Sequence, residues 1–326
     1  MSRYTEMKKI VSVIVVIIII SSIVGISFFG DESDKKYGPI FFTLQGDDMV
    51  SSLPNVFSWD GDKKMTYIST TSNRLLVLAT SSASDKVFAY NGETGKKITE
   101  FDVGENPKGV KINPNERFAF VANEGSNSIS VIELVVGRIM EEIPVGKNPH
   151  NIIFHPTDNL AFITLQGEDK VAIIDTNVFD VISSIPIKGM PHNLDISPDG
   201  KFLYVTSITN NDVVVIDLEN QQIIKRIPVS LGHHGIDVSP DGTRIYVSGV
   251  ADNVISVIDA QSLEVISKII VGTGPHGIRT SADGSILYVA VTQTNEIVEI
   301  DTEKLEIINS QNVGNEPFWI AVANNP

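Results

Sequence analysis

A period of 42 residues, repeated six times without an insertion or deletion, is the strongest constraint on the fold of this 326-residue chain. Seven positions mark the period: Thr66, Lys108, His150, His192, His234, His276 and Phe318. A fixed period of about 40 residues is typical of supersecondary units that bury their apolar faces only against neighbouring units. The pattern therefore predicts a stacked array of equivalent units.

One repeat, from His192 to His233, contains four short β-rich runs joined by turns. A Ser-Pro-Asp-Gly turn at 197–200 separates the first two runs, because Pro presets φ and Gly accepts a positive φ. The second and third runs are apolar on both faces, as expected for buried strands. The fourth run carries Lys225 and Arg226, which suit an exposed edge. Such units, arranged around an axis, form an all-β propeller with four-stranded blades.

The blade count follows from the two ends of the repeat array. Residues 66–317 hold six full repeats, and Phe318–Val322 matches only a first strand. Residues 40–50 mirror residues 161–171, so the segment from about 39 to 65 supplies the later strands of another blade. We therefore predict a seven-bladed β-propeller at 39–326, with its last blade split between the N- and C-termini.

Polar residues recur on both sides of the third run. One set precedes the run: Asp85, Asn127, Asp169, Asn211, Asn253 and Asn295. The other set ends it: Asn91, Glu133, Asp175, Asp217, Asp259 and Asp301. Because they recur in every repeat, we interpret them as structural residues that close hairpins by bonding to the backbone two residues further on.

Three features of the repeat resemble the YVTN family of β-propeller repeats. They are the runs Tyr204–Ser207 and Tyr246–Gly249, the Ser-Pro-Asp-Gly turns, and the Val-Ile-Asp endings at 215–217 and 257–259. The resemblance covers nearly everything after residue 38. It implies a propeller, often at the cell surface, but no single reaction, since members include surface-layer proteins, binding modules and relatives of haem d1-binding domains.

The N-terminal region contains a predicted membrane segment. Residues 10–29 are uncharged and mostly apolar, long enough for a transmembrane helix. Arg3, Lys8 and Lys9 precede this segment and acidic residues follow it, which places residues 1–9 in the cytoplasm and the propeller on the extracytoplasmic side. We therefore expect a single-pass signal anchor in the cell membrane with a linker at 30–38. A cleaved signal peptide is the alternative.

The net charge and the cysteine content limit the kinds of partner and cross-link that we expect for this chain. The net charge of −15 disfavours nucleic acid. The chain has no cysteine, so it uses no disulfides. The expected partners are the membrane, through the N-terminal helix, and a protein or glycan at the propeller.

Four of the six histidines, His150, His192, His234 and His276, occupy the same repeat position. First strands line the channel of a propeller, so these side chains form an arc near one mouth that suits Cu, Zn or haem. Strand alternation instead places His192 on the apolar face of Leu194 and Ile196, unless the preceding turn redirects it. A hydrogen-bonded structural histidine therefore remains the alternative.

Further candidate ligand-binding residues lie on the same inner strands. Asp195, Asp237 and Arg279, with Lys111, occupy equivalent positions on the channel face and are expected to pair with one another. Phe318 and Trp319 begin the split blade and form either an aromatic platform for a ligand or part of the core.

These features support three hypotheses about function. The first is a membrane-anchored binding or scaffold module that engages a protein, glycan or small ligand at a channel mouth. The alternative is a metal- or haem-dependent enzyme or redox protein that uses the histidine arc. A structural cell-envelope component is the third. No catalytic residue is identified.

Overall fold

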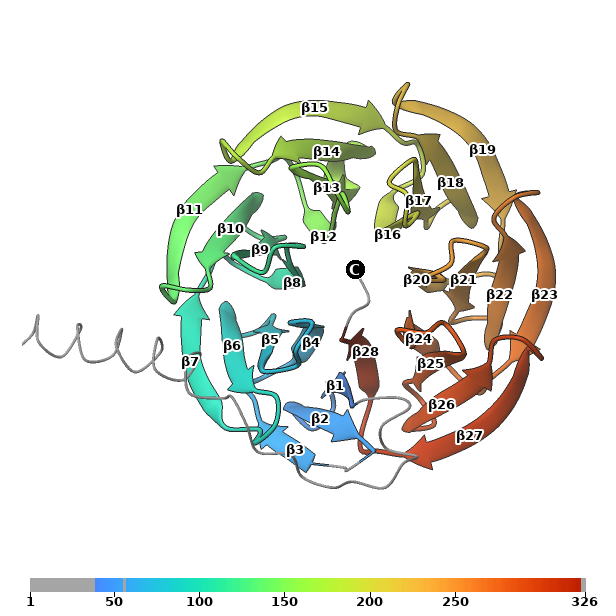
Figure 1. Cartoon of the computed structure of the whole chain (residues 1–326), viewed down its shortest axis with the longest axis horizontal. Helices are drawn as coiled ribbons and strands as arrows, with labels where there is room; N and C mark the ends of the chain where they lie inside the picture. Colours follow the sequence, from blue (N-terminus) through green and yellow to red (C-terminus); the bar gives the residue numbers. More distant parts are fainter. Residues whose placement is uncertain (1–38, 55–56, 324–326) are drawn as a thin grey trace, which may run out of the picture.

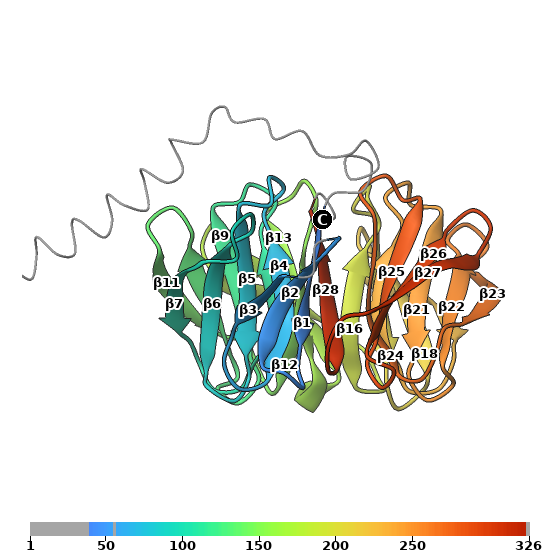
Figure 2. The ribbon, with the colours of Figure 1, turned by 90° about the horizontal axis from the view of Figure 1, so that it is seen from below.

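Seven four-stranded antiparallel sheets stand around one axis in the computed structural model, which describes residues 39–54 and 57–323 (Figure 1). Turned by 90°, the sheets stand upright, side by side (Figure 2). The predicted seven-bladed propeller is confirmed. The predicted membrane helix at 10–29 lies outside the described residues, and within those residues no helix has the length and apolar character needed to cross a bilayer.

The seven blades use the same strand order. From the channel outward they are: β4 (Met65–Thr70), β5 (Leu76–Ser81), β6 (Lys86–Asn91), β7 (Lys97–Asp102); β8 (Pro107–Ile112), β9 (Phe118–Asn123), β10 (Ser128–Glu133), β11 (Arg138–Pro144); β12 (Pro149–Phe154), β13 (Leu160–Leu165), β14 (Lys170–Asp175), β15 (Asp180–Pro186); β16 (Pro191–Ile196), β17 (Phe202–Ser207), β18 (Asp212–Asp217), β19 (Gln222–Pro228); β20 (His233–Val238), β21 (Arg244–Gly249), β22 (Val254–Asp259), β23 (Glu264–Ile270); β24 (Pro275–Thr280), β25 (Ile286–Val291), β26 (Glu296–Asp301), β27 (Glu306–Asn312); and β28 (Pro317–Val322), β1 (Ile40–Leu44), β2 (Met49–Leu53), β3 (Phe57–Asp60). A short 3-10 helix, η1 (Gln166–Glu168), joins β13 to β14.

The last blade combines both ends of the described chain. Its inner strand β28 pairs antiparallel with β1, with Ile40 opposite Val322 and Phe42 opposite Ile320. The two strands lie side by side in both views (Figures 1 and 2). This pairing confirms the predicted split blade and removes a free sheet edge from the ring.

The apolar pattern of each repeat explains how the blades pack. Strands β17 and β18 are buried along almost their whole length, whereas β19 at the perimeter is largely exposed. Apolar clusters join neighbouring blades, as where Ile153 of β12 packs in one cluster with Leu194 and Leu203 of the next blade. Burial of both faces of every inner sheet is the main stabilising contribution.

The two recurrent polar sets do different structural work. The set before the third strand adopts a positive φ of 52–63°, which Asn and Asp tolerate better than most residues. Its side chains bond to the connection that leads into the next blade, since Asn127 Oδ1 accepts from the Asn148 amide at 2.9 Å and Asp169 Oδ1 from the Met190 amide at 2.9 Å. The predicted bond to the backbone two residues on is therefore wrong for this set. It is right for four members of the second set, as where Asp217 Oδ1 accepts from the Glu219 amide at 2.9 Å, whereas Asp259 accepts from the Ser262 amide, three residues on.

Candidate functional site in the central channel

The inner strands begin with a β-bulge that redirects the histidines. In β12, Pro149 lies opposite Leu165 and Ile152 opposite Ile163, so His150 and Asn151 together face one residue, Thr164. The same shift occurs at the start of β16, β20 and β24. A bulge breaks the alternation of side chains. Consecutive residues therefore both point toward the channel, and the placement of the histidines on the apolar face by simple alternation is wrong.

In five of the seven blades a buried hydroxyl on the second strand accepts a hydrogen bond from the bulge, whereas Ala122 and Ala290 occupy the equivalent positions in the other two. Thr164 Oγ1 accepts from the Asn151 amide at 3.0 Å and donates to the His192 carbonyl of the next blade at 2.7 Å. Hydroxyls at the equivalent positions accept the corresponding amide in four other blades: Thr43, Thr80, Thr206 and Ser248. The bulge and its hydroxyl thus set the spacing of neighbouring inner strands.

The four histidines at the shared repeat position form a continuous row of rings, called here the histidine cluster. Ring centroids are separated by 4.1 Å between His150 and His192, 4.4 Å between His192 and His234, and 3.4 Å between His234 and His276. Phe318 continues the row, 4.1 Å from His276. The cluster lies at the end of the channel where the inner strands begin, and this end is called here the histidine mouth.

Exposure differs along the cluster. His150 and His192 are buried, whereas His234, His276 and Phe318 are partly exposed at the mouth. The predicted arc of histidines around one mouth is therefore present, and its accessible part lies on the last two histidines and Phe318.

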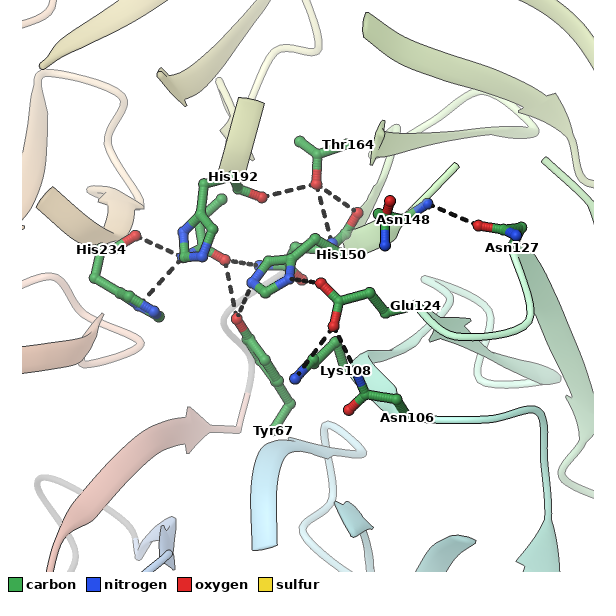
Figure 3. A network of polar contacts seen from close by, with 12 residues as sticks. Tyr67, Asn106, Lys108, Glu124, Asn127, Asn148, His150, Thr164, His192 and His234 are labelled. Atoms are coloured by element: carbon green, nitrogen blue, oxygen red, sulfur yellow. Dashed lines mark hydrogen bonds and ion pairs between the residues drawn. The ribbon is translucent and has the colours of Figure 1, made fainter. Parts of the chain in front are cut away.

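His150 connects the cluster to a polar network on the neighbouring blades (Figure 3). Its Nε2 lies 2.8 Å from the Tyr67 hydroxyl, and its Nδ1 lies 3.7 Å from Glu124 Oε1, beyond hydrogen-bond distance. Glu124 forms an ion pair with Lys108 at 3.3 Å. Burial raises the pKa of Tyr67 well above its ordinary value, so this hydroxyl stays protonated.

The amide of Asn193 determines how the middle of the cluster is hydrogen-bonded. Its Nδ2 donates to His192 Nδ1 at 2.9 Å and to the His234 carbonyl at 2.6 Å, while its Oδ1 accepts from Asn151 Nδ2 at 2.7 Å. Because an amide nitrogen only donates, His192 Nδ1 acts as the acceptor in this arrangement. Asn193 thus fixes the tautomer of His192.

His276 is the exception within the cluster. Neither of its ring nitrogens is hydrogen-bonded to any residue in the described part of the chain, and its Nδ1 is buried. Burial, together with the neighbouring imidazole of His150, lowers the pKa of His276 to about 3. Burial likewise lowers the pKa of His150, His192 and His234. All four side chains are therefore neutral imidazoles near neutral pH, the form that binds metals.

The geometry of the cluster is not that of a closed Cu or Zn site. His150 and His192 are stacked, with 28° between their planes, rather than directed at a common point. Among residues 39–54 and 57–323, no group of three or more His, Cys, Asp or Glu side chains is arranged to hold a metal ion. The cluster offers single imidazole ligands at the mouth instead.

A charged layer lies next to the histidine cluster. Arg279 Nη1 is 3.0 Å from Asp237 Oδ1, which confirms the expected pairing. The carboxylates also form hydrogen bonds between neighbouring blades, since Asp195 accepts from the Val238 amide at 2.9 Å and Asp237 accepts from the Thr280 amide at 2.7 Å. Burial nevertheless raises the pKa of Asp237 to about 6. Both aspartates therefore have a structural role between blades.

A cavity of about 340 Å³, called here the channel cavity, opens at the opposite mouth, where the inner strands end. Lys111, Asn151, Arg279 and Trp319 line its inner part. Trp319 is 4 % exposed and lies 4.5 Å from the Tyr67 ring, centroid to centroid. Phe318 and Trp319 therefore serve different ends of the channel, since Phe318 extends the histidine cluster and Trp319 lines the cavity.

Sequence reasoning missed Tyr67 and Asn151 as site residues, and it gave Asn193 no role in the site. Tyr67, Asn151 and Asn193 contribute to the polar network, and they were hidden because the bulge could not be foreseen from one strand alone. The recurrent hydroxyl of the second strand, such as the Thr of the Tyr-Val-Thr run, is a signal that accompanies the bulge in five of the seven blades.

The fold and channel define a seven-bladed propeller with a histidine-lined mouth. The family described as "Cytochrome D1 heme domain" matches residues 155–317, half of the chain, and the chain therefore belongs to this family. The YVTN assignment stays a prediction. No curated protein matches the chain.

Solved structures show the same fold at low sequence identity. Hydrazine synthase of Kuenenia stuttgartiensis is similar with a TM-score of 0.73 and 20% identity, over 80% of this chain and 91% of that chain. A functionally unknown protein from Desulfotomaculum acetoxidans gives 0.74 and 14%, over 86% and 98%. The dihydro-heme d1 dehydrogenase NirN, in complex with DHE, gives 0.70 and 16%, over 91% and 77%.

Proposed function

We propose that this propeller binds a haem-type tetrapyrrole at the histidine mouth, with His276 as an axial ligand to the iron. The observation that carries the proposal is the row of four neutral imidazoles, partly exposed at the mouth, in a chain of the haem d1 domain family. A neutral imidazole is the most common axial ligand of haem iron.

His276 fits this role better than the other three histidines. Tyr67 occupies Nε2 of His150, and Asn193 donates to Nδ1 of His192 and lies 3.4 Å from Nδ1 of His234. An Nδ1 that accepts a hydrogen bond leaves the proton on Nε2, which blocks ligation through that atom. The Nδ1 of His276 has no such donor, so the Nδ1–H tautomer is free to form and leaves the Nε2 lone pair available.

The surroundings of the mouth also suit a flat apolar macrocycle. Phe318 packs on His276, and two exposed apolar side chains, Met190 at 37 % and Leu231 at 53 %, stand on the connections that lead into β16 and β20. Exposed apolar side chains beside the axial histidine offer apolar surface that a bound macrocycle can cover. By contrast, none of the described residues that line the channel cavity is His, Met, Tyr or Cys, the usual axial ligands.

A bound haem would supply one-electron redox chemistry at the mouth. The chain's own residues hold the ring of His276 in place through Phe318 and His234. The Lys108–Glu124 ion pair, 3.7 Å from His150, places ionisable groups beside the cluster. A redox or haem-handling role thus accounts for the site better than a scaffold role.

The membrane placement is a further proposal. It is supported by the apolar segment at 10–29 and the basic residues before it. Protease added outside intact cells should digest an epitope tag in an exposed loop of the propeller, while a tag placed before residue 10 should be protected. The opposite pattern would contradict the outward orientation.

Haem binding is tested by titrating the full chain with hemin, and separately with haem d1, while absorbance is followed. We expect saturation at one tetrapyrrole per chain with the spectrum of an imidazole-ligated iron. The His276→Gln variant should lose that spectrum, whereas His192→Gln, which alters a hydrogen-bonded member of the cluster, should keep it. Binding of neither tetrapyrrole by a folded chain, or equal spectra for both variants, would contradict the proposal.

A further inference from the structure

We infer that a groove between two neighbouring blades is a binding site for a small uncharged aromatic molecule. The groove, called here the interblade groove, has a volume of about 280 Å³ and lies between the blade of β4–β7 and the blade of β8–β11, which adjoin in Figure 1. Its walls are largely apolar: Leu76, Leu78, Ala89, Phe101, Leu134 and Val135. No member of the histidine cluster is among the described residues that line it, so the inference does not depend on haem binding.

At later interfaces of the ring, a side chain from the turn between the third and fourth strands fills the equivalent space. The last residue of this turn recurs every 42 residues, and it is Phe179, Leu263 and Leu305 in three blades. Phe179 lies edge-on to Phe118 of the preceding blade, with ring centroids 5.2 Å apart, and Leu263 and Leu305 pack against the apolar clusters of their own interfaces. Gln221, at the same turn position, bonds to the preceding blade instead.

The backbone conformation shows that these side chains are kept for their contacts. Phe179, Gln221, Leu263 and Leu305 have a positive φ of 53–58°, a region that is unfavourable for residues other than Gly, Asn and Asp. Gly137 has this position in the blade of β8–β11, with a φ of 70°. A Cβ atom there would meet no atom of the described structure within 4 Å, its chain neighbours aside. The interblade groove is therefore space that a side chain fills at later interfaces and that Gly137 leaves open.

Gly95 occupies the same turn position in the blade of β4–β7, but it makes room for a ring that is already present. A Cβ atom at Gly95 would collide with the indole of Trp59, from the outer strand of the preceding blade. Trp59 lies between Phe41 and Tyr90, at centroid distances of 5.7 and 5.6 Å. Aromatic rings, Trp59 and Phe179, thus fill the interfaces on both sides of the interblade groove. An aromatic ligand in the groove would occupy the equivalent place between them.

The turn that borders the interblade groove is apolar where the other repeats have polar residues. Val135 lines the groove and is 53 % exposed, and Val136 beside it is 37 % exposed. The residues equivalent to Val135 in the other full repeats are Glu93, Asn177, Glu219, Gln261 and Glu303. Exposed apolar side chains at a position that is otherwise polar indicate a surface that a ligand covers.

The volume and the charge of the interblade groove define the ligand further. A volume of about 280 Å³ exceeds the roughly 150 Å³ of a cavity that accepts benzene, so the groove can hold two fused rings. Glu116 is the charged residue among the described residues that line it, and its carboxylate accepts a hydrogen bond from the Ser72 amide. A ligand carboxylate would meet a like charge at Glu116 in largely apolar surroundings, which is unfavourable. The ligand is therefore an uncharged aromatic compound of one or two rings.

Calorimetric titration of the full chain with 2-naphthol tests the inference, with 2-naphthoate as the anionic analogue. We expect one 2-naphthol per chain, bound about tenfold more tightly than 2-naphthoate. The Gly137→Phe variant, which places in the groove the ring that Phe179 supplies at the next interface, should lose about tenfold or more in 2-naphthol affinity. Gly137→Ala is the matched control, because it makes the same change to the backbone without a ring, and it should bind 2-naphthol as the wild type does.

Thiol protection gives an independent readout if Gly137→Phe does not fold. The chain has no cysteine, so Val135→Cys introduces a single thiol at the interblade groove. Bound 2-naphthol should slow its reaction with an uncharged maleimide. The control is Val178→Cys, in the turn whose Phe179 fills the next interface, and its reaction rate should not change.

Four results would overturn the inference. They are the absence of 2-naphthol binding, tighter binding of 2-naphthoate, a folded Gly137→Phe chain with unchanged affinity, and equal protection of the two thiols. Protection of Val135→Cys by phosphatidylcholine vesicles in the absence of 2-naphthol would identify lipid as the occupant and would also contradict an aromatic ligand. His276→Gln should leave 2-naphthol binding intact, so failure of the haem proposal would not affect this result.

Discussion

Replacing Thr164 by Val tests whether the bulge hydroxyl holds the inner strands in position. The side chain is fully buried, and its Oγ1 is bonded to both the Asn151 amide and the His192 carbonyl, at 3.0 and 2.7 Å. Val has the same shape as Thr but neither donates nor accepts a hydrogen bond. The substitution therefore leaves two buried backbone groups without their hydroxyl partner.

Each unsatisfied buried group costs about 1–3 kcal/mol, so we expect Thr164→Val to lower the free energy of unfolding by about 2–6 kcal/mol. Denaturant unfolding followed by circular dichroism measures this loss. Thr176→Val is the matched control, because Thr176 lies in the turn after β14 and its hydroxyl has no hydrogen bond in the described structure, so we expect a change within about 0.5 kcal/mol. Equal stabilities for the two variants would refute the idea that this hydroxyl fixes the bulge.

Two further predictions concern acid stability and ring closure. His276 has a pKa of about 3 when folded, against an ordinary value of 6.5, so the unfolded state binds more protons between these two pH values. The free energy of unfolding should therefore fall as the pH drops below 6.5, by about 2 kcal/mol at pH 5 from this residue alone. Unfolding of the wild type and His276→Phe at pH 7 and pH 5 checks this, and equal losses for both would contradict it. Deleting residues 318–326 should leave β1 without its inner partner and unfold the ring; a truncated chain that elutes as a folded monomer in gel filtration would show that closure by β28 is dispensable.

The repeat explains why so much of the fold was predictable from sequence. A turn such as 197–200 needs only local chemistry, and the split blade follows from matching residues 40–50 to 161–171. Both signals lie within the sequence of a single repeat or its copies. The blade number and the strand order therefore needed no knowledge of tertiary contacts.

The site was less predictable, because its geometry depends on contacts between strands and blades. The register of β12 against β13 decides where His150 points, and a one-residue bulge reverses the outcome of strand alternation. The hydrogen bond of Asn127 likewise goes to a residue half a repeat away rather than to its own turn. The channel cavity, with Lys111 and Arg279 from different blades, exists only once the ring is closed.

The shared last blade has a consequence for the order of events during synthesis. The strands β1, β2 and β3 emerge from the ribosome before every other described strand, yet β1 lacks its inner neighbour until β28, the last of them, has been made. Ring closure therefore waits for the synthesis of β28, and until then the unpaired edge of β1 is open to pairing with other chains.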